Sequence, residues 1–182
     1  MTLTLALTLP PASVLLQVLE GDASRPAQWW DGELFDAILH MHIHIHIYTH
    51  THAGELFDAI ILDVPCSSTG LLRTHPEVKL RQTEASVERL SQEQLQLLRT
   101  TWPLVRDGGE LLYSTCSLLS DENEGVIERF MQGESQAESI RLALPLKKER
   151  DGSLMVRKAH GVLLLPAQRH QGGFAALLRK RP

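Results

Sequence analysis

The stretch FDAIILDVPCSSTG at residues 57–70 decides the fold. Its first six residues form a nearly continuous apolar run that is bounded by Asp63 and Pro65. Such a run is typical of a strand buried in a parallel sheet. A second strand is predicted over residues 110–115, where Gly108 and Gly109 turn the chain into it.

Helical segments separate the predicted strands. A helix is predicted from Thr83 to Trp102, where Pro103 closes it, with an inward face formed by Val87, Leu90, Gln94, Leu97 and Leu98. A second helix is predicted from Ser120, as its cap, through Phe130, with Asp121, Glu122 and Glu124 at its positive end. Further strands are predicted over 2–9, 161–165 and 174–178, the last two as an antiparallel pair. Alternating strands and helices predict an α/β sheet.

Both cysteines follow predicted buried strands. Cys66 comes after the first of them and Cys116 after the second, so two thiols and the Asp63 carboxylate are expected at one sheet edge. Ligands bind at the carboxyl ends of strands in open α/β sheets. Burial as a small apolar side chain is the alternative for either cysteine. The spacing excludes a C-x-x-C redox motif, a phosphate-binding P-loop and a C-x5-R loop.

Composition indicates one ordinary globular domain. The chain has 182 residues, of which 43% are hydrophobic, and only two cysteines. No run of eighteen apolar residues exists, and no basic start precedes the first apolar stretch, so we expect a cytoplasmic protein without a membrane segment. Residues 1–140 carry a net charge of −12 and residues 141–182 one of +8. The basic part either steers toward phosphate or forms a solvated surface.

Residues 39–60 read as a repeat-derived insertion. The sequence GELFDAI occurs at 32–38 and again at 54–60, and six of the nine histidines lie between the copies. If one copy and the histidines are removed, the remaining sequence leads without interruption into the strand that ends at Asp63. A competing hypothesis is a metal column on one strand face, formed by His40, His42, His44 and His46. We expect no physiological metal there, because no second shell is evident.

Three motifs carry a family resemblance. DVPCSSTG at 63–70, RTHPEVK at 73–79 and WPLVRDGGELLYSTCSLLSDENE at 102–124 resemble the RsmB/Fmu/Sun (Nop2/Sun-like) RNA cytosine-C5 methyltransferases. Residues 19–30 and 172–180 also resemble that family. The resemblance implies a Rossmann-like class I methyltransferase sheet, S-adenosyl-L-methionine as cofactor and RNA, ribosomal RNA in particular, as partner. It implies neither a membrane nor a required protein partner.

The resemblance also assigns roles to residues. It implies that Cys116 is the nucleophile that adds to cytosine carbon 6, that Cys66 assists product release and that Asp63 holds the cytosine near the methionine end of the cofactor. Such a nucleophile needs a thiol that is more acidic than a free one. Asp22 corresponds to the residue that meets the adenine end. Arg73 and His75 are candidates for RNA contact or for loop stabilisation.

The family's glycine-rich cofactor loop has no counterpart before Asp63, where the glycines are isolated. We therefore expect a single partial catalytic domain over 1–182 that lacks the first two strands of the family sheet. The neighbour of the strand at 57–62 would then be the strand at 2–9 or the His-Ile tract. Two alternatives to an active enzyme stay open: a catalytically inactive RNA-binding remnant and a non-physiological translated fragment.

Overall fold

The computed structural model describes residues 17–19, 37–39, 45–48, 56–142, 154–167 and 170–182. Its main sheet contains β3 (Ile45–Tyr48), β4 (Phe57–Asp63), β5 (Val105–Thr115), β6 (Ala137–Ile140), β7 (Leu154–Lys158), β8 (Gly161–Leu165) and β9 (Gly173–Lys180). The strand order is β3-β4-β5-β9-β8-β7, and β6 also pairs with β9. A separate parallel pair is formed by β1 (Gln17–Leu19) and β2 (Ala37–Leu39).

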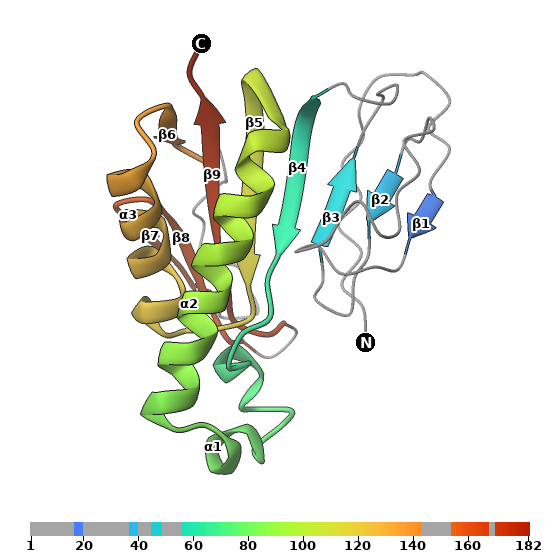
Figure 1. Cartoon of the computed structure of the whole chain (residues 1–182). Helices are drawn as coiled ribbons and strands as arrows, with labels where there is room; N and C mark the ends of the chain where they lie inside the picture. Colours follow the sequence, from blue (N-terminus) through green and yellow to red (C-terminus); the bar gives the residue numbers. More distant parts are fainter. Residues whose placement is uncertain (1–16, 20–36, 40–44, 49–55, 143–153, 168–169) are drawn as a thin grey trace.

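The predicted parallel centre of the sheet is confirmed. β4 and β5 are parallel neighbours, and their arrowheads in Figure 1 point to the same end of the molecule. β9 runs antiparallel to β5 and β8, as the sequence predicts for the last two strands. β5 starts at Val105, five residues earlier than the sequence predicts. Gly108 (φ +76°) does not form a turn before the strand; it lies within the first part of β5, where the pairing with β4 is irregular.

The outer neighbour of β4 is a strand from the His-Ile tract. β3 pairs antiparallel with β4, with Ile45 opposite Leu62 and Tyr48 opposite Ala59. Of the two candidate neighbours that the sequence offered, the structure uses this one. The strand predicted over residues 2–9 lies outside the described residues.

Two helices, α2 (Glu84–Thr101) and α3 (Glu124–Gly133), lie side by side on one face of the sheet (Figure 1). α2 (Glu84–Thr101) begins at a capping box in which Thr83 and Ser86 exchange hydrogen bonds, and it confirms the predicted helix. A short helix, α1 (Val78–Arg81), precedes it.

α3 (Glu124–Gly133) starts later than the sequence predicts. The prediction of a helix from Ser120 is wrong, because residues Ser120–Glu122 form a separate 3-10 turn, η4. The Asn123 side chain caps nothing; it accepts from Thr115 Oγ1 at 2.6 Å and donates to the Ser117 carbonyl at 3.0 Å. These bonds tie the start of α3 to the end of β5.

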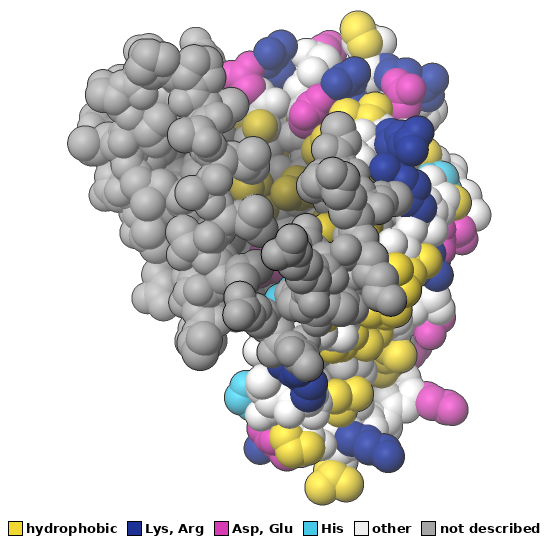
Figure 2. All heavy atoms as spheres, turned by 180° about the vertical axis from the view of Figure 1, so that it is seen from behind, with side chains coloured by type: hydrophobic (Ala, Val, Ile, Leu, Met, Phe, Trp, Pro, Cys, Tyr) yellow, Lys and Arg dark blue, Asp and Glu magenta, His cyan; other side chains and the backbone are white. Residues whose placement is uncertain are grey.

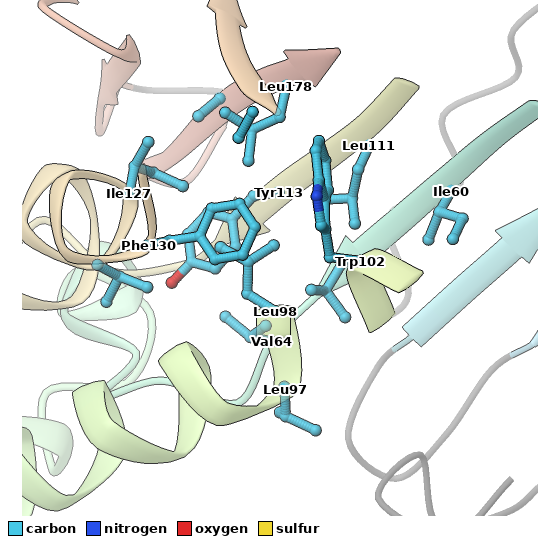
Figure 3. Close-up of a cluster of buried hydrophobic side chains, with 14 of the residues drawn as sticks. Ile60, Val64, Leu97, Leu98, Trp102, Leu111, Tyr113, Ile127, Phe130 and Leu178 are labelled. Atoms are coloured by element: carbon cyan, nitrogen blue, oxygen red, sulfur yellow. The ribbon is translucent and has the colours of Figure 1, made fainter. Parts of the chain in front are cut away.

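The core fills the space between the helices and the sheet, as the close-up in Figure 3 shows. Leu98 of α2, Leu111 and Tyr113 of β5, and Ile127 of α3 are fully buried. Trp102 meets Phe130 edge to face with ring centroids 5.3 Å apart. Each such side chain contributes about 1.5–3 kcal/mol on burial. This packing fixes the positions of β4 and β5, and therefore of the loops that follow them.

None of the helices in the described part of the chain combines the length and the apolar character needed to cross a bilayer.

Candidate active site

Two thiols meet at the carboxyl ends of β4 and β5. Cys66 follows β4 and Cys116 directly follows β5, and the two sulfur atoms lie 3.0 Å apart. Each cysteine is partly buried, and each is a free thiol. The parallel pairing of the two strands produces this proximity, as the sequence predicted.

The short sulfur–sulfur contact makes the two thiols chemically different. The pKa of the Cys116 thiol is lowered from 9.0 to about 7, mainly by the hydrogen bond with Cys66 and also by the Ser68 hydroxyl, which lies 3.5 Å from the Cys116 sulfur. The same contact with Cys116, together with burial, raises the pKa of Cys66 far above its ordinary value. Cys116 is therefore the thiol of the pair that ionises as pH rises through about 7, while Cys66 stays protonated.

The loop after Cys66 approaches the rest of the site through its backbone. Gly70 N donates to the Cys116 carbonyl at 2.8 Å, and Gly172 N donates to the Gly70 carbonyl at 3.0 Å. A Cβ at Gly70 would lie 2.2 Å from the Gly172 oxygen and 2.7 Å from the Cys116 oxygen. Only glycine fits where these three segments meet. Ser68, two residues earlier, has a left-handed backbone with φ 59°.

A buried carboxylate that the sequence analysis did not assign to the site bonds to both cysteine loops. Glu122 is fully buried and accepts from Ser67 N at 2.7 Å, from Ser117 Oγ at 2.5 Å and from Gln94 Nε2 at 3.1 Å; the Ser67 hydroxyl also donates to it. The sequence predicts that Glu122 lies at the positive end of a helix that starts at Ser120; it lies instead in the 3-10 turn η4, two residues before α3, with its side chain buried. The sequence does hold one indication of this network: each cysteine is followed directly by a serine, and both serines donate to Glu122.

Asp63 lies at the end of β4, beside the residues that lead to Cys116. It accepts a hydrogen bond from Ser114 Oγ at 2.8 Å, and the two residues are register partners across β4 and β5. Its negative charge opposes ionisation of Cys116, but the hydrogen bond from Cys66 outweighs this effect. The structure thus brings Asp63, Cys66 and Cys116 to one sheet edge.

The other predicted site residues are not part of this group. Arg73 and His75 are exposed between the 3-10 turn η2 (Thr69–Leu71) and α1, and His75 Nδ1 lies 3.2 Å from Glu77 Oε1. Asp22 lies outside the described residues, as do the side chains of the histidine tract. Within the described residues, no three His, Cys, Asp or Glu side chains are grouped so that they could hold a metal ion.

The sequence matches a methyltransferase family. The family described as 16S rRNA methyltransferase RsmB/F matches residues 41–179. The probable ribosomal RNA small subunit methyltransferase B of Coxiella burnetii is 43% identical over 131 residues, which are 71% of this chain and 29% of that protein. The ribosomal RNA small subunit methyltransferase B of Pseudomonas syringae pv. tomato is 34% identical over 87% of this chain and 30% of its own length.

The chain belongs to the RsmB/F family, and it spans less than a third of the length of these two curated relatives. A crystal structure of PH0851 superposes with a TM-score of 0.57 at 34% identity, over 69% of this chain and 27% of that one. NSun6 from Pyrococcus horikoshii, solved with SFG, shares the fold with a TM-score of 0.52 at 24% identity, over 71% of this chain and 31% of that one.

The fold is therefore the Rossmann-like α/β sheet of class I methyltransferases. Within the described residues, the strand that pairs with β4 on the side away from β5 is the antiparallel β3.

Proposed function

We propose that this chain carries the catalytic cysteines of an S-adenosylmethionine-dependent RNA cytosine-C5 methyltransferase whose substrate is ribosomal RNA. The observation that carries the proposal is the thiol pair: the two sulfur atoms lie 3.0 Å apart, and this contact is the main reason why the pKa of Cys116 is lowered to about 7. A thiolate available at neutral pH is what addition to a pyrimidine ring requires. A cytoplasmic location belongs to the same proposal, because the curated relatives are named for ribosomal RNA.

Cys116 acts as the nucleophile in this proposal. Its thiolate adds to carbon 6 of a cytosine that has left its stack, and the electron pair of the 5,6 double bond makes carbon 5 nucleophilic. S-adenosylmethionine, when bound, supplies a methyl group on a sulfonium centre for this carbon. The Asp63 carboxylate, held by Ser114 Oγ at 2.8 Å, accepts a hydrogen bond from the exocyclic amino group of the base.

Cys66 acts in the release step. After methylation, solvent water takes the proton from carbon 5, the freed electron pair re-forms the 5,6 double bond, and the bond between carbon 6 and the Cys116 sulfur breaks with its electron pair returning to that sulfur. The raised pKa of Cys66 keeps its proton in place, so its S–H stabilises the departing thiolate. The two cysteines thus have different tasks because their proton affinities differ.

The described residues fit the methionine end of the cofactor better than its nucleoside end. Asp63 offers a carboxylate at the carboxyl end of β4, where an ammonium group pairs well. The glycines that precede it in the chain are Gly21, Gly32 and Gly54, each isolated. Close backbone approach to a nucleoside needs a glycine turn. We therefore expect this chain to bind S-adenosylmethionine with a Kd in the millimolar range, which isothermal titration calorimetry measures; micromolar binding would contradict this expectation.

Transfer of a labelled methyl group tests the function. The full chain is incubated with small-subunit ribosomal RNA and millimolar labelled S-adenosylmethionine, and the digested RNA is analysed for 5-methylcytidine by mass spectrometry. We expect the product with the wild-type chain and none with Cys116→Ala. Labelled RNA without 5-methylcytidine would contradict the proposal.

An inactive RNA-binding remnant is the second candidate, and its support is the excess of basic residues after residue 140. Part of this charge is already neutralised, because Arg179 pairs with Glu110 at 2.6 Å. Figure 2 shows acidic and basic side chains mixed at the top of the molecule, the end at which β9 finishes. The mixture favours the methyltransferase proposal over a dedicated basic surface. RNA binding without any methyl transfer would favour the remnant.

A further inference from the structure

One carboxylate connects the residues that follow the two thiols. Ser67 comes directly after Cys66, and Ser117 directly after Cys116. Both hydroxyl groups donate to the same oxygen, Glu122 Oε2, and the Ser117 bond measures 2.5 Å. The other oxygen, Oε1, accepts from Ser67 N at 2.7 Å. One side chain therefore bonds to both cysteine loops, in addition to direct bonds between them such as that from Gly70 N to the Cys116 carbonyl.

The network around Glu122 is closed by a residue of α2. Gln94 Nε2 donates to Glu122 Oε1 at 3.1 Å and to the Pro65 carbonyl at 2.8 Å, so it also holds the segment that precedes Cys66. These donors to Glu122 are neutral N–H and O–H groups. A carboxylate buried among neutral donors is costly to desolvate. Packing alone therefore does not account for the Glu122 carboxylate at this position.

We propose that Glu122 is a positioning residue that holds the Cys66 and Cys116 sulfurs in contact, acting through Ser67 and Ser117 without touching the substrate. This inference rests on the proposed function, because the contact matters only if Cys116 is the nucleophile. The geometry alone already separates Glu122 from its neighbour in the same motif, Asp121, which is exposed.

The sign of one effect distinguishes a positioning role from a purely electrostatic one. The negative charge of Glu122 raises the pKa of Cys66, so loss of that charge alone would lower the pKa of Cys66 and would not raise that of Cys116. Loss of the link between the loops would instead lengthen the sulfur–sulfur contact and weaken the hydrogen bond that lowers the pKa of Cys116. A positioning role thus predicts a rise in the pKa of Cys116, and a purely electrostatic role predicts none.

The experiment compares Glu122→Gln with Asp121→Asn, which removes the same charge one residue away on the surface. Each full-length variant is alkylated with iodoacetamide across pH 5–10, and the rate at Cys116 is followed by peptide mass spectrometry. We expect the midpoint for Cys116 to rise by about one pH unit or more in Glu122→Gln, toward the value of a free thiol, and to stay near 7 in Asp121→Asn. An unchanged or lower midpoint in folded Glu122→Gln would overturn the proposal.

Ser117→Ala keeps the proposal testable if Glu122→Gln does not fold. It removes the hydroxyl that joins the Cys116 loop to Glu122 and leaves the carboxylate three donors. We expect a smaller rise of the Cys116 midpoint, and no rise would count against the positioning role. The wild-type curve tests the proposed function separately: a wild-type midpoint at the free-thiol value would argue against Cys116 as nucleophile, whatever the variants do.

Discussion

The Cys66 sulfur lies 3.0 Å from the Cys116 sulfur, although the two residues are 50 positions apart in the chain. Parallel pairing of β4 and β5 brings their carboxyl ends together, and the Gly70 N–H bond to the Cys116 carbonyl holds the following loops in contact. The contact gives the two thiols different proton affinities, and the proposed division of tasks between them follows from that difference.

Removal of Cys66 should make Cys116 less reactive at neutral pH. In the wild-type chain the thiolate of Cys116 forms as pH rises through about 7. Cys66→Ala removes the S–H donor that stabilises this thiolate, so the pKa of Cys116 should rise and the midpoint of its iodoacetamide alkylation should move to higher pH. Cys66→Ser keeps a donor and should give a midpoint between the two. Identical midpoints in all three proteins would show that the contact does not acidify Cys116.

Gly70→Ala should destabilise the chain. The new Cβ would lie 2.2 Å from the Gly172 oxygen, which is backbone and cannot turn away. We expect a loss of about 1–3 kcal/mol in the free energy of unfolding, measured by urea denaturation. Gly133→Ala is the matched control, because its Cβ would meet only the far end of the Arg99 side chain at 3.8 Å. Equal stability of the two variants would contradict the close approach.

The repeat-derived insertion over 39–60 is a proposal that a deletion can test. After removal of these residues, Phe35–Ile38 supplies the same FDAI sequence that starts β4. The deletion also removes β3 and leaves one edge of β4 unpaired. We therefore expect a chain that still melts cooperatively, but at a lower Tm than the wild type, by circular dichroism. Loss of cooperative melting would contradict the interpretation of these residues as an insertion.

The sequence predicted those features that depend on local pattern. The strand β4 follows from its apolar run, the helix α2 from its amphipathic period, and the position of both cysteines from where the two predicted strands end. The role of Glu122 could not be predicted, because the DENE run contains three acids and no local rule says which one turns inward. Its partners decide this, and Ser67 comes from a loop 55 residues away.

The same limit applies to the edge of the sheet. Both the strand predicted over residues 2–9 and the His-Ile tract alternate with period two, so pattern alone could not choose the neighbour of β4. The register of Ile45 against Leu62 is a tertiary pairing. Local periodicity therefore gives the strands, while long-range contacts decide their order.

The most direct test of the account is the RNA adduct that each cysteine variant leaves. Full-length Cys66→Ala and Cys116→Ala chains are incubated with small-subunit ribosomal RNA and S-adenosylmethionine, denatured, and separated on a gel that resolves protein from protein–RNA conjugates. The account predicts a denaturation-resistant adduct for Cys66→Ala, because Cys116 adds to the base but is not released, and none for Cys116→Ala. An adduct that forms in Cys116→Ala and not in Cys66→Ala would contradict the assignment of Cys116 as the nucleophile.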